Sequence, residues 1–326
     1  MGSETISKID SIISRTNTHP EYSVSTARRL KDILRDEAAK HSYEIEYIQV
    51  RDLGDIVERR GGGVEQKTFN RLKNAWDHLA QNGLNFHSLY NLGHIIDPES
   101  NRSSGLRKLE VQFGGFAPPA PSVLPDRVHG LAYFLENVQI HPVRRAVNAH
   151  LDTVMIHPYE DGNGRAARLL QNFCLDERGY PSAIIPSTEA RLYRTLIGET
   201  IKERVSGAGS WKDPGKAEES FVEYISSKIL SSAQRLEQEL KSKRAYTVLL
   251  KERGNPGLAH VTARKIRSKG RFGGNEGIKV SVDKKNGNRG ESLTVIGDIS
   301  QKDLNKILSE VVGRHSIKYS IDNNSC

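Results

Sequence analysis

Apolar residues recur every three or four positions through most of residues 1–242, and this helical spacing is what most constrains the fold. The segment HPVRRAVNAHLDTVMIH shows it best, because four apolar residues stand four apart and predict one buried helix face: Val143, Val147, Leu151 and Met155. Further helices are predicted over residues 24–41, 64–80, 85–96, 126–138, 164–179, 188–201 and 218–243. The sequence therefore predicts a mainly α bundle in this region.

Strand-like alternation interrupts the helices once, in LRKLEVQF (106–113), which is followed by Gly114-Gly115 and predicts a small β-hairpin. The tail has a different pattern: strand, Asn-Gly turn and strand in GIKVSVDKKNGNRGESLTVIGD, then the helix QKDLNKILSEVVG and a last strand in HSIKYSID. We therefore expect an N-terminal helical region (1–84), a helical core (85–244) and a small C-terminal α+β module (245–326).

Charge is distributed unevenly. Residues 241–326 hold 18 Lys and Arg against 8 Asp and Glu, so this tail carries more than the whole net charge of +8. Such asymmetry favours a separate module with an anionic partner.

No apolar run is long enough for a membrane span or a secretory signal, and the two cysteines, Cys174 and Cys326, imply no disulfide framework. We therefore expect a cytoplasmic protein without membrane contact.

One stretch, His157 to Arg168 (HPYEDGNGRAAR), carries the residue types that phosphoryl transfer requires. A helix is predicted to end at His157 and the next to begin near Gly164, which places the glycines at a helix N-terminus. Unpaired N–H groups and the helix dipole make such a terminus an anion site, and glycine lets phosphate oxygens approach the backbone.

The side chains of this stretch add three further functions. Arg165 and Arg168 share a face of the first helical turn and can contact successive phosphates. Asp161 is an oxygen ligand suited to Mg²⁺, and His157 can accept a proton at neutral pH. The combination favours phosphoryl transfer over a plain helix–helix turn. A dinucleotide-binding loop is disfavoured, because the preceding segment is helical and the third glycine is missing.

The same stretch resembles the signature of the Fic family, His-Pro-Phe-x-(Asp/Glu)-Gly-Asn-Gly-Arg-x-x-Arg, with Tyr159 in place of the phenylalanine. The resemblance covers about residues 42–235. It implies a Fic-type helical bundle with a small β-hairpin flap. It also implies a protein adenylyltransferase that moves AMP from ATP to a Ser, Thr or Tyr hydroxyl of a target protein or of itself. The hydroxyl of Tyr159 needs a partner if this side chain anchors the loop in the core.

Residue by residue, the resemblance implies that His157 is the base, Asp161 holds Mg²⁺ (or Mn²⁺), Arg165 binds the inner phosphates and Arg168 the γ-phosphate. The α-phosphate cradle would be Gly162, Asn163 and Gly164. Tyr193 stands where the family often places an aromatic residue beside the adenine, although ordinary helix packing explains it equally well. The flap that registers an extended target by strand addition would be Leu109, Glu110, Val111, Gln112 and Phe113. Arg107 either orients this flap or is an exposed arginine.

Ser42 and Glu46 have the spacing of the family's inhibitory helix, Ser/Thr-x-x-x-Glu-Gly/Asn, with Tyr47 at the last position. The resemblance implies that Glu46 pairs with Arg168 and blocks a productive γ-phosphate pose. The alternative is a glutamate on a solvated helix surface.

Other functions stay open beside AMP transfer. A Fic enzyme can have another activity, such as removal of AMP or UMP transfer. A nucleic-acid-binding or toxin–antitoxin regulator would instead use the basic tail, where a solvated linker beside a small module is the preferred interpretation of KIRSKGRFGGNEG. A pair of His150 and His157 at one metal is disfavoured, because further ligands are missing. The resemblance also admits a homodimer.

Overall fold

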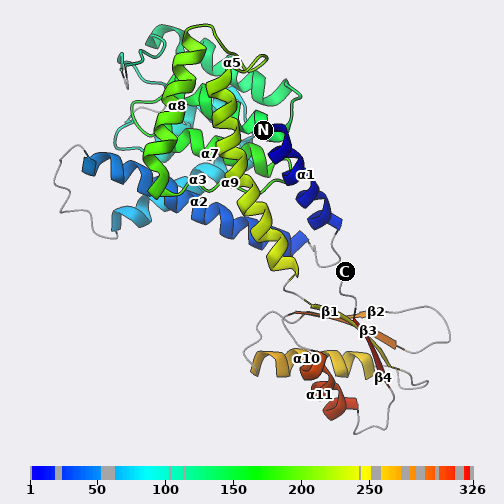
Figure 1. The fold of residues 1–326 in the computed structure, drawn as a ribbon. Helices are drawn as coiled ribbons and strands as arrows, with labels where there is room; N and C mark the ends of the chain where they lie inside the picture. Colours follow the sequence, from blue (N-terminus) through cyan, green and yellow to red (C-terminus); the bar gives the residue numbers. More distant parts are fainter. Residues whose placement is uncertain are drawn as a thin grey trace. The chain divides into compact units, whose positions relative to one another are not determined.

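The structure is a computed structural model. It describes residues 2–18, 24–52, 63–102, 105–112, 115–241, 244–250, 258–272, 279–283, 291–297, 301–312 and 319–323. The chain divides into two compact units, one of residues 1–15 and 27–234 and one of residues 16–26 and 235–326. Each is described by itself (Figure 1).

The part before residue 242 is helical, as the apolar spacing predicts. Its helices are α1 (Gly2–Thr18), α2 (Val24–Asp52), α3 (Gly63–Asn82), α4 (Phe86–Ile96), α5 (Leu124–Asn137), α6 (Pro142–Ile156), α7 (Asn163–Asp176), α8 (Ala190–Val205) and α9 (Lys216–Lys241), with short 3₁₀ turns at Pro121–Val123 and Ser187–Glu189. The helix α1 was not predicted. Its buried isoleucines have helical spacing and join the main core: Ile6, Ile9, Ile12 and Ile13.

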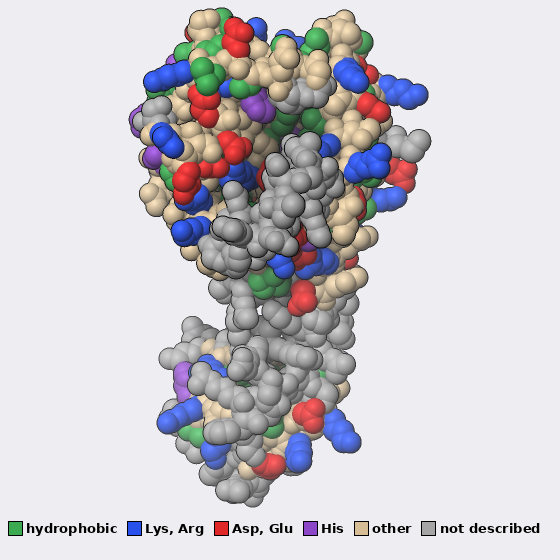
Figure 2. Space-filling view, turned by 90° about the vertical axis from the view of Figure 1, so that its left-hand side faces the viewer, with side chains coloured by type: hydrophobic (Ala, Val, Ile, Leu, Met, Phe, Trp, Pro, Cys, Tyr) green, Lys and Arg blue, Asp and Glu red, His purple; other side chains and the backbone are tan. Residues whose placement is uncertain are grey.

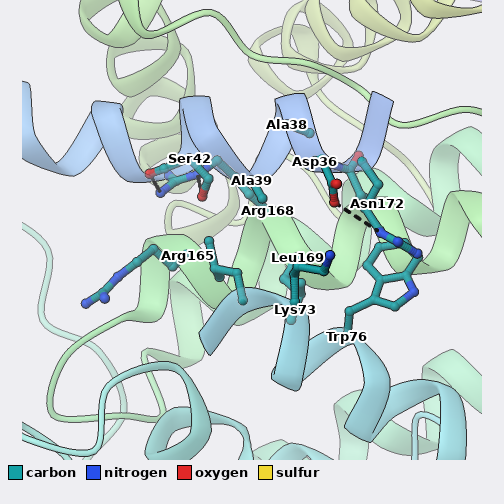
Figure 3. A pocket seen from close by; sticks show the side chains of 12 residues that line it. Asp36, Ala38, Ala39, Ser42, Lys73, Trp76, Arg165, Arg168, Leu169 and Asn172 are labelled. Carbon is teal, nitrogen blue, oxygen red and sulfur yellow. Dashed lines mark hydrogen bonds and ion pairs between the residues drawn. The ribbon is translucent and has the colours of Figure 1, made fainter. Parts of the chain in front are cut away.

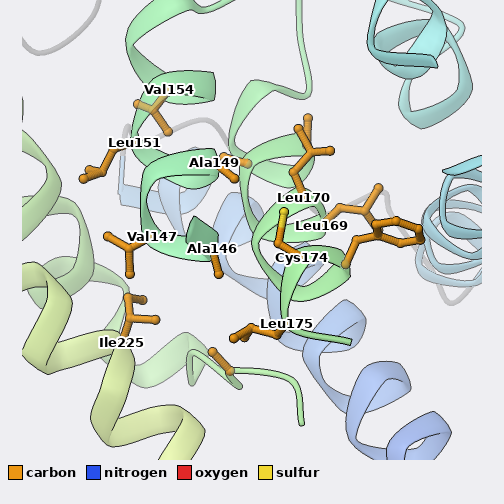
Figure 4. Close-up of a cluster of buried hydrophobic side chains, with 14 of the residues drawn as sticks. Ala146, Val147, Ala149, Leu151, Val154, Leu169, Leu170, Cys174, Leu175 and Ile225 are labelled. Atoms are coloured by element: carbon orange, nitrogen blue, oxygen red, sulfur yellow. The ribbon is translucent and has the colours of Figure 1, made fainter. Parts of the chain in front are cut away.

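The core of the first unit centres on α6 and α7. Val143, Val147 and Leu151 of α6 have no exposed surface, which confirms the predicted buried face. They belong to one cluster with Leu170 and Leu175 of α7 (Figure 4). Full burial of such a side chain contributes about 1.5–3 kcal/mol, so this pair of helices is a rigid base for the loop between them. Side chains of α1 and α3 belong to the same core as those of α4–α9.

Tyr159 anchors that loop to α4. Its side chain is 1% exposed, and its hydroxyl donates to the carbonyl of Leu89 at 2.6 Å, which is the partner that the sequence required. The ring lies so close to Gly93 that a Cβ there would be 2.3 Å from Cδ1 of the tyrosine.

The predicted β-hairpin is wrong for the described residues. Residues 105–112 and 115–120 form no extended strand, and Phe113 lies outside the described residues. The reason is that Arg107 binds the carbonyls that a hairpin would use: Nη1 donates to Leu109 at 2.6 Å and Nη2 to Pro119 at 2.5 Å. Leu109 remains 67% exposed on this irregular segment.

The second unit is an α+β module. Its elements are β1 (Arg244–Leu250), α10 (Leu258–Phe272), β2 (Lys279–Asp283), β3 (Glu291–Gly297), α11 (Gln301–Val312) and β4 (Tyr319–Asn323). The sheet order is β2-β3-β1-β4 with antiparallel pairs, and Val248 lies opposite both Leu293 and Ile321. This βαββαβ arrangement is that of ferredoxin-like folds.

Two elements of this module correct the sequence interpretation. The strand β1 and the helix α10 were not predicted, and the basic residues Arg264, Lys265 and Arg267 lie on α10 rather than in a linker. They are exposed, whereas Ala263 and Ile266 of the same helix are buried. Acidic as well as basic side chains are visible on this unit (Figure 2). Among the described residues of the whole chain, no helix is long and apolar enough to cross a membrane.

The close contact between Gly93 and Tyr159 yields a prediction for stability. Gly93→Ala is expected to lower the free energy of unfolding, because its Cβ would collide with a ring that has no room to move. Gly130→Ala is the matched control, since Gly130 lies in α5 with nothing within 4 Å of its Cβ. That change is expected to stabilise by about 0.5–1 kcal/mol, the helical preference for alanine. Urea denaturation measures both, and equal effects would contradict the argument.

Candidate functional site

The loop between α6 and α7 begins at a strained residue. His157 ends α6 with φ 48° and ψ 59°, and it is the one non-glycine residue with positive φ among those described. Left-handed backbone at such a residue costs on the order of 1 kcal/mol and persists only where the surroundings enforce it. Arg107 does so here, since its Nε donates to the His157 carbonyl at 2.7 Å. Arg107 is 2% exposed, so it is a buried support of the loop.

Two asparagines hold the rest of the loop. The Asn163 side chain brackets Tyr159, accepting from its N–H at 2.9 Å and donating to its carbonyl at 2.8 Å. Asn101 accepts from the Glu160 N–H at 2.8 Å and donates to the Asp161 carbonyl at 3.0 Å. Asn101 is 1% exposed and was missed, because its contacts span about sixty positions and nothing in the neighbouring sequence marks it.

The N-terminus of α7 has the geometry of an anion site. Gly162 has φ 85° and precedes the helix, whose first hydrogen bond runs from the Ala166 N–H to the Gly162 carbonyl. The N–H groups of Asn163, Gly164 and Arg165 precede that bond, so they have no partner within the helix and can bind an anion.

Arg165 is held by carboxylates. Its Nη2 donates to Oδ2 of Asp97 at 2.8 Å, and Oδ2 of Asp161 lies 3.6 Å away. Burial alone would raise the pKa of Asp97, but the hydrogen bonds from Arg165 and Ser100, together with the charge of Arg165, outweigh it and lower the pKa. Asp97 was not predicted as a site residue. The Asp161 side chain is 62% exposed, so it can reach a bound ion.

A cavity of about 550 Å³ brings seven of the predicted site residues together. It is lined by Glu46, His157, Asp161, Asn163, Gly164, Arg168 and Tyr193. Ser42, Gly162, Arg165 and the predicted flap residues Leu109 to Gln112 are not among its lining residues, whereas Gly115 and Phe116 are. The sequence did not predict the wall that α8 supplies. That wall consists of Arg194, Ile197, Gly198, Ile201, Lys202 and Val205, with the apolar residues four positions apart.

His157 is neutral in this cavity. Its pKa is lowered to about 4, chiefly by burial and also by the charge of Arg107, whereas a backbone contact and Glu46 act in the opposite direction. The contact joins Nδ1 to the Val154 carbonyl at 3.4 Å, so Nδ1 carries the hydrogen and Nε2 the lone pair. The imidazole can therefore accept a proton at neutral pH.

Arg168 is buried and held by α2. Its Nε donates to the Ser42 hydroxyl at 2.8 Å, and its Nη2 donates to the Ser42 carbonyl at 3.0 Å. Nη2 also donates to Oε1 of Glu46 at 2.5 Å, which is the contact that the spacing of Ser42 and Glu46 implied. Figure 3 shows Ser42 above Arg168, where α2 crosses α7.

Glu46 also occupies space in front of the glycine loop. A Cβ on Gly164 would be 2.7 Å from Oε1 of Glu46, so the carboxylate lies directly against the N-terminus of α7. Burial alone would raise the pKa of Glu46, but Arg168, Arg165 and Arg194 outweigh it and lower the pKa. Glu46 is thus a charged group placed where an anion would bind.

Tyr193 is more deeply buried than an aromatic ring that only stacks beside an adenine needs to be. Its side chain is 3% exposed, and its hydroxyl accepts a hydrogen bond from Nη1 of Arg168 at 3.2 Å. His150, predicted to be a packed residue, has no exposed surface and no metal partner among the described residues. The described residues contain no cluster of three His, Cys, Asp or Glu that could hold a metal.

Comparison with known proteins agrees with this geometry. Residues 69–175 match the model of the Fic/DOC family. The protein adenylyltransferase Fic of Culex quinquefasciatus is 40% identical over 105 residues, which are 31% of this chain and 20% of that protein. The protein adenylyltransferase fic-1 of Caenorhabditis elegans is 35% identical over 109 residues, 32% of this chain and 21% of that protein. The chain thus matches about a fifth of the length of these curated relatives.

Solved structures share the fold over a larger part of the chain. A Fic domain containing signaling protein from Bacteroides thetaiotaomicron has a TM-score of 0.56 and 23% identity, covering 73% of this chain and 98% of that one. A Fic family protein from Desulfovibrio desulfuricans has a TM-score of 0.56 and 17% identity, covering 97% of this chain and 86% of that one. The loop between α6 and α7 lies within residues 69–175, so this loop of the candidate site belongs to the part of the chain that matches the Fic/DOC family.

Proposed function

We propose that the protein transfers AMP from ATP to a hydroxyl of a protein, and that Glu46 restrains this activity. The observation that carries the proposal is the cavity itself, which joins a neutral imidazole, a helix N-terminus with glycines and a buried arginine. The curated relatives that match this domain are protein adenylyltransferases, which supports the same reaction.

In the proposed reaction Nε2 of His157 takes the proton of the target hydroxyl, and the hydroxyl oxygen attacks the α-phosphorus of ATP. The bond from that phosphorus to the β-bridging oxygen breaks, and pyrophosphate leaves. The N–H groups at the start of α7 stabilise the charge on the α-phosphate, and Arg168 binds the terminal phosphate. The apolar wall of Ile197 and Ile201, beside Tyr193, suits the adenine.

The described residues of the protein alone offer too few ligands to hold a divalent cation at this site. Asp161 is a single, largely exposed carboxylate, and Mg²⁺ is commonly bound by one or two carboxylates together with substrate phosphates. Asp161 would therefore hold Mg²⁺ jointly with ATP, and the ion would neutralise charge on the phosphates. The homodimer and the nucleic-acid contact that the sequence admits stay predictions.

The proposed restraint is a direct competition. Glu46 binds Arg168 and lies against Gly164, so a terminal phosphate cannot reach the arginine while the carboxylate is there. Removing the carboxylate should leave Nη2 of Arg168 available to a phosphate. Ser42 and Tyr193 would still hold the guanidinium in place.

Labelling tests both parts of the proposal. The purified chain is incubated with Mg²⁺, candidate target proteins and ATP labelled on the α-phosphate, and label on protein is counted. Glu46→Gly is expected to raise labelling at least tenfold over wild type, and His157→Ala in the Glu46→Gly protein to lower it at least a hundredfold, within the usual contribution of a general base.

Glu44→Gly is the matched control for the restraint. Glu44 lies on the same helix but contacts Ser187 and His41 instead of Arg168, so labelling should stay at the wild-type level. Equal labelling in wild type and Glu46→Gly would refute the restraint while keeping the transfer reaction. Label that persists in the His157→Ala variant would refute the mechanism.

The charge state of His157 is a separate prediction. Since its pKa is lowered to about 4 from an ordinary 6.5, the imidazole should remain neutral as the pH falls from 8 to 5. The NMR shift of its Cε1 proton, assigned by loss of the signal in His157→Ala, should change little over this range. The urea-unfolded chain should titrate near 6.5 instead. A midpoint between 6 and 7 in the folded protein would contradict the burial argument.

The contribution of Asp161 can be measured through the ion. Asp161→Asn should raise the Mg²⁺ concentration for half-maximal labelling about tenfold or more in the Glu46→Gly protein, because a neutral amide binds a hard cation more weakly. Glu160→Gln is the control on the adjacent residue, whose carboxylate accepts from the Lys108 N–H. Similar Mg²⁺ dependence in both variants would exclude Asp161 as the ligand.

A further inference from the structure

A series of buried hydrogen bonds continues from Arg168 into the core. Nη1 of Arg168 donates to the Tyr193 hydroxyl at 3.2 Å, the hydroxyl lies 2.8 Å from Nε2 of His150, and Nδ1 of His150 lies 2.9 Å from Oε1 of Gln171. All four side chains are nine-tenths buried or more. The series links α6, α7 and α8, which are three of the helices that line the cavity.

The direction of these bonds follows from the chemistry of the end groups. The carbonyl oxygen of Gln171 can only accept, so Nδ1 of His150 carries the hydrogen and Nε2 carries the lone pair. The Tyr193 hydroxyl therefore donates to Nε2, which turns the lone pairs of its oxygen toward Arg168. Burial, with the charge of Arg168, lowers the pKa of His150 to about 3, so this arrangement persists at neutral pH.

Packing fixes the members of the series in place. The rings of His150 and Tyr193 meet edge to face at 5.6 Å, and Phe221 packs against His150 at 5.4 Å with no exposed surface of its own. Arg168 also lies 5.7 Å from the centre of the Tyr193 ring. The hydroxyl has little freedom to leave Arg168, because the ring that carries it is enclosed.

Arg168 is thus held by two different groups of contacts. Ser42 and Glu46 belong to α2, and the Glu46 contact must break before a phosphate can bind. Tyr193 belongs to the wall of the cavity and keeps its contact when Glu46 leaves. A buried arginine without that contact could adopt several rotamers, which would weaken its grip on a phosphate.

We propose that Tyr193, oriented by His150 and Gln171, is a positioning residue that holds the Arg168 guanidinium for the terminal phosphate of ATP once Glu46 has left it. This assignment rests on the proposed function. It differs from a role beside the adenine, because it uses the hydroxyl of Tyr193 and leaves the ring free to line the cavity.

Tyr193→Phe in the Glu46→Gly protein is the test, since it keeps the ring and removes only the hydroxyl. Calorimetric titration with ATP and with AMP, both with Mg²⁺, reports on binding without requiring transfer. The dissociation constant of ATP is expected to rise about tenfold, the loss typical of one hydrogen bond to a charged group. The dissociation constant of AMP should change less than twofold, because AMP has no terminal phosphate for Arg168.

Two controls separate positioning from general packing. Tyr180→Phe removes another buried tyrosine hydroxyl, which donates to Asp10 at 2.6 Å and is not part of the cavity, and it should leave both affinities unchanged. Tyr193→Phe with Glu46 still present should change the ATP affinity less than threefold, because the phosphate does not reach Arg168 there. A purely structural effect would be the same with and without Glu46.

The series behind Tyr193 is tested by replacing His150. His150→Gln, whose amide oxygen can accept from the Tyr193 hydroxyl, should keep more ATP affinity than His150→Leu, which cannot. Thermal unfolding confirms that each variant is folded. Unchanged ATP affinity in folded Tyr193→Phe, or an equal loss for ATP and AMP, would overturn the proposal. A Glu46→Gly protein that binds no ATP would refute the proposed function and this assignment together.

Discussion

The structure depends on the hydrogen bonds made by the backbone of one loop, whose peptide groups belong to neither a helix nor a strand. Residues 157–162 connect two helices at the centre of the core, so their peptide groups cannot all rely on water. Arg107 donates to the His157 carbonyl through its side chain and to the Pro158 carbonyl through its backbone N–H. Asn101 and Asn163 each supply two further hydrogen bonds to main-chain atoms of the loop. The shape of the loop is therefore set by side chains, and the left-handed backbone of His157 follows from that shape.

This support explains how a short connection can present several reactive groups at once. Tyr159 and the asparagines hold the inner side of the loop, which leaves His157, Asp161 and the start of α7 to line the cavity. Burial of the surroundings also keeps His157 neutral, since the charged imidazole would lose its hydration. The same packing that stabilises the domain thus keeps the proposed base in the form that can accept a proton.

The sequence predicted the contiguous parts of the site, and the family resemblance added one distant contact, between Glu46 and Arg168, but the other distant contacts were missed. The stretch from His157 to Arg168 was identified because helix end, glycines and arginines stand in one order along the chain. Asn101, Asp97 and the His150–Tyr193 pair could not be identified, because each acts through a partner more than twenty positions away. The segment 106–113 was predicted as a strand from its alternation, but the guanidinium of Arg107 binds the Leu109 carbonyl within it and the Pro119 carbonyl after it. The helix α1 could have been predicted from the helical spacing of its isoleucines. The helix α10 was harder to predict, because basic residues and glycines at its end are typical of a linker.

In the proposed restraint, the carboxylate of Glu46 acts as a tethered ligand of the phosphate site. A ligand joined to its own receptor binds with an effective concentration, often millimolar for a flexible tether and higher for one on a rigid helix. The terminal phosphate of a free nucleotide must compete with Glu46 for Arg168. Its apparent affinity is therefore the intrinsic affinity multiplied by the fraction of molecules in which Glu46 has left the arginine. Any contact that tilts or unwinds α2 near Ser42 changes this fraction without touching the cavity. Control of the site can then be exerted through one turn of a helix that takes no part in the chemistry.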